Sequence, residues 1–217
     1  MVKRLLQIAA IASVCGTAWC AEFSAIIKDA DGRPLPDAVV VAIPTDRPLV
    51  LPARRSTAIE DQVDKEFVPY VNPILVGTSV TFPNSDNVRH HVYSFSQSKR
   101  FELPLYAGTP AKPVVFDAAG VVVIGCNIHD WMVSYIYVSE SPYFAKTGAD
   151  GAVKLDDLPP GSYQVRAWHP RLIAPEETTR RAVLLTNVKA GVLEWQLELR
   201  PEKRTRRAPV AGQRSRY

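Results

Sequence analysis

Short hydrophobic runs rich in Val, Ile, Tyr and Phe recur along the chain and are separated by polar turn signals. The runs occupy residues 23–27, 38–43, 79–82, 121–124, 135–138, 163–168 and 192–199. Several are bounded by turn-forming combinations, namely Asp31-Gly32, Pro36-Asp37, Asp150-Gly151 and Pro159-Pro160-Gly161. Runs of this length between Gly, Pro and Asp are typical of strands and hairpins. No long segment has the period of an amphipathic helix. The pattern predicts an all-β protein of sandwich type.

The first residues have a different composition from the rest of the chain. Lys3 and Arg4 precede an apolar stretch over residues 5–14, and the small-residue segment Ala18-Trp19-Cys20-Ala21 follows it. This order predicts a secretory signal peptide over residues 1–21. The apolar stretch is shorter than the roughly 20 residues of a membrane span, and no later segment is long and apolar enough. We therefore expect an exported, periplasmic protein without a transmembrane segment.

The net charge of +4 is unevenly distributed. Residues 1–21 carry +2 and residues 200–217 carry +6, which leaves −4 on residues 22–199. The folded body is therefore mildly acidic, and we expect residues 201–217 to form a basic disordered tail. A nucleic-acid partner is not expected for an exported protein of this kind.

Cys126 is the cysteine that remains if the chain is cleaved after Ala21, because Cys15 and Cys20 leave with the signal peptide. A single thiol cannot form an intramolecular disulfide, and a free thiol is a liability in an oxidising compartment unless it is buried or bonded. An inert packed cysteine is the simpler explanation in general. The neighbouring His129 and Met132 favour metal ligation instead.

The segment from Cys126 to Met132 concentrates three potential metal ligands within seven residues, with His129 between them. A second source of imidazole, His90-His91, follows a polar turn after an apolar run. One thiolate, two imidazoles and a thioether form the ligand set of a type 1 copper site. Adjacent strand residues point to opposite faces, so one of the two histidines faces the metal. We favour His90 and keep His91 open. Zinc competes for Cys and His, but a thioether favours copper.

The predicted ligands are His90, Cys126, His129 and Met132, and their pattern resembles that of cupredoxins. The spacing Cys-x-x-His-x-x-Met is similar to that of amicyanin, whereas plastocyanin and pseudoazurin are more distant. Asn84, six residues before His90, also fits the family pattern, and the resemblance covers residues 58–140. It implies one type 1 copper ion, a one-electron carrier and a redox protein partner. Two departures stand out, since His91 replaces the asparagine and Asp130 the proline common in the family.

A second resemblance flanks the first. Residues 27–40 resemble the opening of carboxypeptidase regulatory-like, or transthyretin-like, β-sandwich domains, and residues 150–165 resemble their closing pattern. These resemblances imply that residues 22–57 and 142–200 are two halves of a smaller sandwich that flank an inserted copper domain at residues 58–141. A linear arrangement remains open, with one sandwich over residues 22–140 and a second after it. The whole chain is similar to exported proteins often named methylamine utilization proteins.

The remaining candidate residues have simpler explanations. We expect Trp168-His169-Pro170 to be structural, and we expect Tyr93, Phe95, Tyr135 and Tyr137, which alternate along strands, to serve packing. No nucleophile motif accompanies a histidine outside the copper ligands, and no phosphate-binding glycine loop is present. The protein is therefore not expected to be an enzyme. Two other hypotheses are kept, a periplasmic copper chaperone or sensor and a structural or ligand-binding β-sandwich with a vestigial copper site.

Overall fold

The computed structural model describes residues 21–54, 56–110, 112–186 and 192–202, without the side chains of Ala21 and Glu22. The predicted signal peptide and the basic tail thus lie outside the described residues, apart from Ala21 and the first residues after Arg200. Within the described residues the chain forms strands, turns and one short 3-10 turn, η1 (Glu176–Thr179). The all-β prediction is confirmed.

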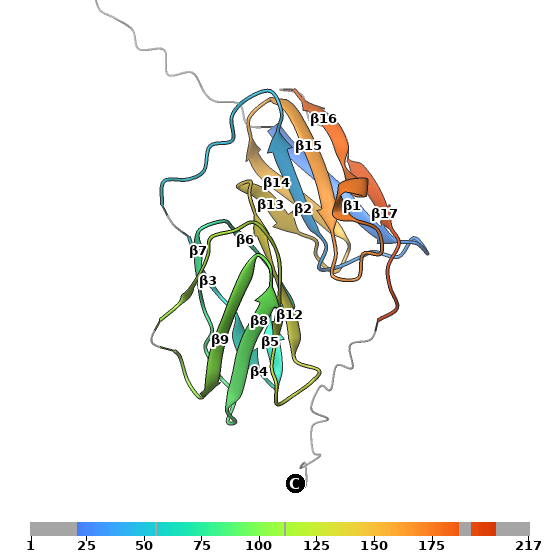
Figure 1. The fold of residues 1–217 in the computed structure, drawn as a ribbon. Helices are drawn as coiled ribbons and strands as arrows, with labels where there is room; N and C mark the ends of the chain where they lie inside the picture. The colour runs from blue at the N-terminus through green and yellow to red at the C-terminus, as the bar shows by residue number, and fades with distance from the viewer. Residues whose placement is uncertain (1–20, 55, 111, 187–191, 203–217) are drawn as a thin grey trace, which may run out of the picture.

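One sandwich packs a three-stranded sheet against a four-stranded sheet. The first sheet has the order β14-β1-β17 and the second the order β13-β2-β15-β16. Their strands are β1 (Ala21–Asp29), β2 (Val39–Pro44), β13 (Tyr143–Lys146), β14 (Ala152–Leu158), β15 (Gly161–Trp168), β16 (Arg181–Leu185) and β17 (Leu193–Leu197). In Figure 1 the blue start and the orange and red end of the chain lie together in this unit. It therefore takes its strands from both ends of the described chain.

The other sandwich is built from the strands between these two groups. A five-stranded sheet has the order β6-β12-β11-β8-β9, and a three-stranded sheet has the order β10-β7-β3. Their strands are β3 (Thr57–Ile59), β6 (Val71–Leu75), β7 (Thr78–Thr81), β8 (His90–Ser96), β9 (Lys99–Tyr106), β10 (Val114–Phe116), β11 (Gly120–Gly125) and β12 (Val133–Ser139). A separate hairpin joins β4 (Asp61–Val63) to β5 (Glu66–Val68). This sandwich carries all four predicted ligands on its strands or in the loops between them.

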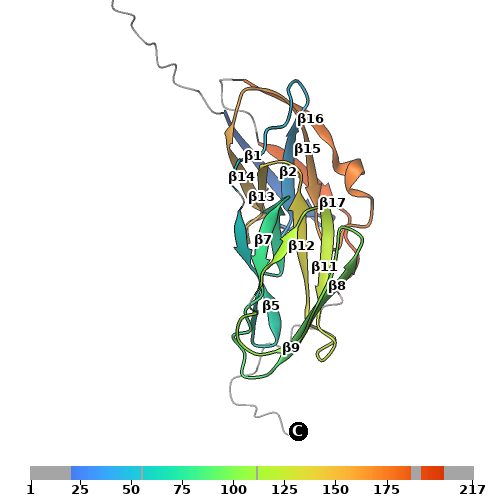
Figure 2. The same ribbon diagram turned by 60° about the vertical axis from the view of Figure 1, so that its left-hand side comes forward.

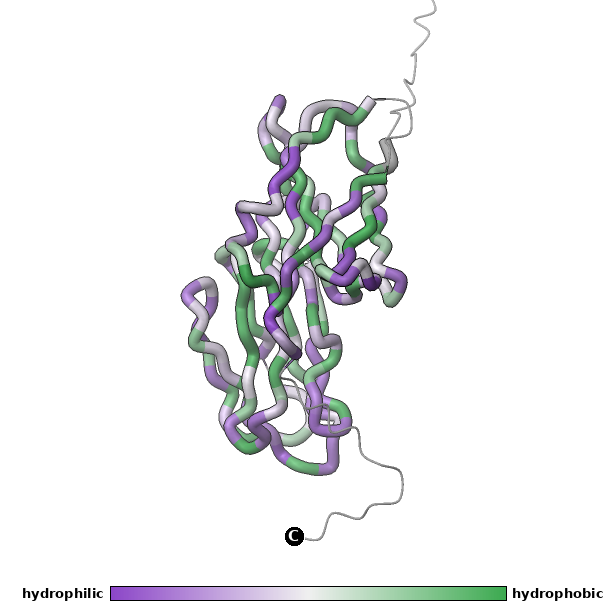
Figure 3. Tube along the Cα trace, turned by 90° about the vertical axis from the view of Figure 1, so that its right-hand side faces the viewer, coloured by the Kyte–Doolittle hydropathy of each residue, from purple (hydrophilic) through white to green (hydrophobic). Residues whose placement is uncertain are grey.

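Alternating burial gives each sandwich its own core. On β1, Phe23, Ala25 and Ile27 are buried and face the first core. In the second sandwich, Val122 and Ile124 of β11 face a core that also contains Phe82 and Phe116. This alternation is expected for strands with one buried face. In Figure 3 hydrophobic and hydrophilic colours accordingly alternate along several strands.

The two sandwiches share a third buried cluster. Val39 and Val41 of β2 and Trp168 of β15 meet Val71 of β6 and Tyr137 of β12 there. Residues 39–42 are all buried, because β2 faces its own core on one side and the other sandwich on the other. Figure 2 shows the two units stacked along the length of the molecule. The contact is therefore part of the folded core.

A partly buried group of charged side chains lies beside this contact. Arg166 of β15 donates to both carboxylate oxygens of Glu140 at 2.8 Å, and its Nε lies 2.7 Å from a carboxylate oxygen of Glu176. The hydroxyl of Tyr137 donates to Glu176. Burial raises the pKa of Tyr137 and of Glu176. Arg166 thus links the two sandwiches through paired charges.

The strand predictions agree closely with the structure, since each of the predicted runs coincides with a strand. The packing prediction holds for Tyr135 and Tyr137, which join the shared cluster. It is wrong for Phe95, whose side chain is 75% exposed on the outer face of β8. Strand alternation alone does not reveal which outer face a second unit covers.

Candidate metal centre

The loop that carries Cys126, His129 and Met132 is short and closed by its own main chain. It connects β11 to β12, and the N–H of Cys126 donates to the carbonyl of Met132 at 3.3 Å. The N–H of Met132 donates in turn to the carbonyl of His129 at 2.9 Å. Because β11 and β12 are paired up to Gly125 and Val133, the strand pairing fixes the positions of both ends of the loop.

His90, Cys126 and His129 converge on one point. One ligand atom from each of these residues lies within 4.8 Å of the other two. The Sγ atom of Cys126 lies 4.0 Å from Nδ1 of His90, and the two imidazole centroids are 5.0 Å apart. Nitrogen and sulfur donors about 2.0 and 2.3 Å from one d-block ion lie about 3.7 Å apart across a trigonal angle. The spacing therefore suits a shared ion.

His90 is the first residue of β8 and is fully buried. Its Nε2 lies 2.7 Å from Oδ2 of Asp86, a side chain that is itself only 10% exposed. A carboxylate only accepts hydrogen bonds, so this contact places the imidazole proton on Nε2 and leaves the Nδ1 lone pair on the side of Cys126. A carboxylate behind a histidine commonly fixes the tautomer of a metal ligand in this way.

His129 lies at the edge of the site. Its Nδ1 atom is buried and has no hydrogen-bond partner among the described residues. Burial lowers the pKa of His129, and the neighbouring His90 lowers it further. Both effects favour the neutral imidazole, which is the form that binds metal ions. A buried, neutral and unpartnered nitrogen on a residue that converges with Cys126 and His90 has the properties of a ligand.

Met132 and Cys126 belong to the same buried cluster, and their side chains are 1% and 4% exposed. Cys126 takes part in no disulfide. A thiol and a thioether are therefore buried in one apolar cluster, and the thiol converges with two imidazoles. This is a soft donor set, which suits copper better than hard cations.

The other two histidines lie outside this group. His91 points to the opposite face of β8, where its Nε2 lies 2.9 Å from Oε1 of Glu102. His169 is buried in the other sandwich, and its Nδ1 accepts a hydrogen bond from the N–H of Arg171 at 3.2 Å. Burial lowers the pKa of His169 to about 4. Of the two upstream candidates, the structure brings His90 to Cys126.

The segment between Asn84 and His90 is held by side-chain hydrogen bonds. Asn84 donates from Nδ2 to the carbonyls of Val88 and Tyr106, and its Oδ1 accepts from the N–H of Asp86. Asn84 can be recognised in the sequence by its distance from His90, whereas Asp86 was not predicted to take part in the site. The available signal was a carboxylate four residues before a candidate ligand. That signal is weak, because Asp is also common in turns.

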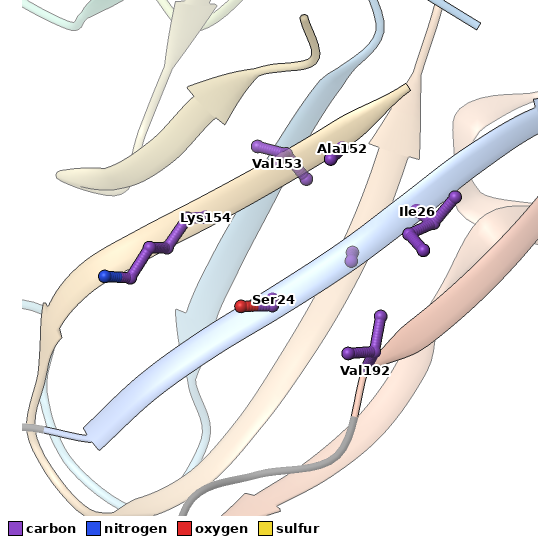
Figure 4. Close-up of a pocket in the computed structure, with 7 residues that line it drawn as sticks. Ser24, Ile26, Ala152, Val153, Lys154 and Val192 are labelled. Carbon is purple, nitrogen blue, oxygen red and sulfur yellow. The ribbon is translucent and has the colours of Figure 1, made fainter. Parts of the chain in front are cut away.

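A shallow hollow on the first sandwich offers no comparable chemistry. It lies on the outer face of β1 and β14 (Figure 4), and it is lined by Ser24, Ala25, Ile26, Ala152, Val153, Lys154 and Val192. None of these residues is a histidine, a cysteine or an acid. The candidate centre is therefore the one between β8 and the β11–β12 loop.

Comparisons with known proteins give partial structural likenesses. No protein-family model matches the chain, and no curated protein matches its sequence. Similar solved structures include a purple cupredoxin from Nitrosopumilus maritimus, at 28% identity and a TM-score of 0.34, covering 38% of this chain and 99% of that one. A copper-containing nitrite reductase from Thermus scotoductus has 26% identity and a TM-score of 0.36, over 44% of this chain and 26% of that one. A Cu(I) mutant of amicyanin has 20% identity and a TM-score of 0.35, over 38% and 82%.

Each of these likenesses covers less than half of this chain. Within the part of the chain that the structure describes, no helix has the length and apolarity needed to cross a bilayer.

Proposed function

We propose that the protein binds one copper ion as a type 1 centre and carries single electrons between redox proteins in the periplasm. Cys126, His90 and His129 are the proposed equatorial ligands, and Met132 is the proposed axial ligand. The observation that carries the proposal is the convergence of the three donor atoms within 4.8 Å, together with the buried and unpartnered Nδ1 of His129.

Each of the proposed ligand residues would contribute a different property to a copper site. When bound there, copper would supply a one-electron Cu(II)/Cu(I) couple. Cys126 would contribute a thiolate, and the two imidazoles would contribute neutral nitrogen donors. The apolar wall around Cys126 and Met132 excludes water, and the paired strands on both sides of the ligand loop limit its movement. A site that moves little suits electron transfer, because both oxidation states then share one geometry.

Two further parts of the proposal come from the sequence. Export to the periplasm is supported by the signal-like first 21 residues and by the single cysteine that remains after their removal. A carrier role, rather than an enzymatic one, is supported by the lack of a nucleophile motif in the sequence. A redox protein is the expected partner.

The test is a copper titration of the purified mature protein. Cu(II) should produce an intense thiolate-to-copper charge-transfer band in the visible spectrum and a reversible one-electron wave in voltammetry. Cys126→Ala should abolish the band. Thr78→Val is a matched control, because Thr78 is also a buried small polar residue of the second sandwich but is not a proposed ligand.

The outcomes separate the competing hypotheses. Tight Cu(I) binding without the band or a reversible wave would favour a copper chaperone or sensor. Preferential zinc binding without a copper band would show that the site is a zinc site instead of a copper site. No metal uptake at all would reject the site and leave a structural or ligand-binding sandwich.

A further inference from the structure

The β4–β5 hairpin reaches the candidate metal centre through its turn. Asp64 and Lys65 connect the two strands and have φ values of 53° and 60°. Positive φ at both central residues is the pattern of the tight hairpin turn that usually takes Asn-Gly or Asp-Gly. A lysine in this region is uncommon, because its Cβ approaches the following carbonyl. Lys65 therefore holds an unfavourable backbone conformation beside the site.

Both main-chain polar groups of Lys65 are bonded to the two loops that supply the proposed ligands. Its N–H donates to Oδ2 of Asp86 at 2.9 Å, and its carbonyl accepts from Nε1 of Trp131 at 3.1 Å. Asp86 is the residue behind His90, and Trp131 lies between His129 and Met132. One residue of the hairpin thus contacts both ligand loops.

The contacts connect the two ligand loops through the backbone of one residue. The indole N–H of Trp131 bonds to the carbonyl of Lys65, and the N–H of Lys65 bonds to Oδ2 of Asp86, which also contacts Nε2 of His90. The same carboxylate oxygen receives the Lys65 and His90 bonds. The links bridge 66 and 21 positions of sequence. A shift of either loop would therefore strain the other through Lys65.

We propose that the main chain of Lys65 is a clasp that holds the two ligand loops at a fixed separation, with Asp86 and Trp131 as positioning residues. Its bearing on copper rests on the function proposed above, whereas its bearing on the loops does not. Asp86 fixes the tautomer of His90 and places a negative charge behind it. Trp131 contacts Lys65 through its indole N–H, and its ring packs against His129 at a centroid distance of 5.0 Å.

The substitutions that test the clasp are Asp86→Asn and Trp131→Phe. The first removes the charge and weakens the acceptor that the Lys65 N–H and His90 share, and the second removes the indole N–H but keeps an aromatic ring. Matched controls lie in the other sandwich. Trp195→Phe removes an indole N–H bonded to the carbonyl of Thr179 at 2.8 Å. Asp29→Asn alters a carboxylate that accepts the N–H groups of Asp31 and Arg33.

The first measurement is amide hydrogen exchange of Lys65 in metal-free protein. Exchange should become faster in both clasp variants, by about 2- to 12-fold, the range of one hydrogen bond. In Asp86→Asn the acceptor of the Lys65 N–H is weakened directly, whereas in Trp131→Phe the effect passes through the loosened Lys65 backbone. Exchange should stay unchanged in both controls. The variants should keep a cooperative unfolding transition, which shows that the sandwich still folds. Unchanged Lys65 exchange in both clasp variants would overturn the clasp, whether or not copper binds.

The second measurement uses copper alone. Copper affinity in a chelator competition should fall about 10- to 100-fold in Asp86→Asn, as is usual when the partner of a ligand histidine is removed. The ratio of Cu(II) to Cu(I) affinity should fall about tenfold, a rise in potential of about 59 mV. The double variant should lose less affinity than the two single losses combined, because both bonds act through one residue. Additive losses would overturn the shared clasp, whereas a wild-type protein without a charge-transfer band would reject only the copper function.

Discussion

The Sγ atom of Cys126 lies 4.0 Å from Nδ1 of His90, although the two residues are 36 positions apart. This pair joins the start of β8 to the end of β11 and sets the position of the candidate centre. It also provides a direct way to distinguish the two adjacent histidines.

His90→Ala should abolish the charge-transfer band, and His91→Ala should retain it. The two imidazoles leave opposite faces of β8, and His91 lies beside Glu102 rather than Cys126. Visible spectra of the two variants loaded with Cu(II) check this prediction. Loss of the band in His91→Ala alone would reverse the assignment.

Met132→Leu should raise the reduction potential while leaving the fold nearly unchanged. Leucine fills a similar volume, so the free energy of unfolding of the metal-free protein should change by less than about 1.5 kcal/mol. It lacks the weak thioether donor that helps to set the potential of such sites. Voltammetry and denaturant unfolding measure the two quantities. An unchanged reduction potential would show that Met132 serves packing and is not a ligand.

Glu60→Gln should make the protein more stable at pH 8 than the wild type and have much less effect at pH 5. Glu60 is fully buried and accepts one hydrogen bond from Nδ2 of Asn72, and burial raises its pKa from 4.5 to about 8. The folded state therefore keeps a proton that the unfolded state has released. The stability associated with that proton is complete below about pH 4.5 and is lost as the pH rises toward 8.

Between pH 5 and pH 8, the free energy of unfolding of Glu60→Gln should rise relative to that of the wild type by about 1.4 kcal/mol per pH unit. The reason is that glutamine imitates the protonated acid at every pH. Denaturant unfolding of both proteins across this range provides the measurement. A stability difference that does not vary with pH would show that Glu60 does not titrate on folding.

Arg166→Met should destabilise the protein by about 2 kcal/mol, because it leaves two partly buried carboxylates without their cation, and the cost falls between that of an exposed pair and that of a fully buried one. The side chain of Arg166 is only 12% exposed between Glu140 and Glu176. Lys154→Met is the control, since Lys154 pairs with Asp156 on the surface, and it should cost less than about 1 kcal/mol. Equal effects of the two substitutions in denaturant unfolding would contradict a structural role for the inter-sandwich pair.

Much of the fold follows from local sequence. Alternating apolar residues specify strands such as β1 and β15, because a strand with one buried face repeats every two residues. The loop from Cys126 to Met132 could be identified because its three ligands lie within one turn between two strands. His90 could be favoured over His91 because adjacent strand residues face opposite sides.

Only the tertiary structure determined which residues far apart in the sequence contact one another. The sequence does not reveal that Lys65 connects Asp86 to Trp131, because this link arises from hydrogen bonds across 21 and 66 positions. The exposure of Phe95 and the burial of Tyr137 likewise depend on which outer face the other sandwich covers. Periodicity reports whether a side chain leaves a strand on one face or the other. Only the packed chain determines what meets it there.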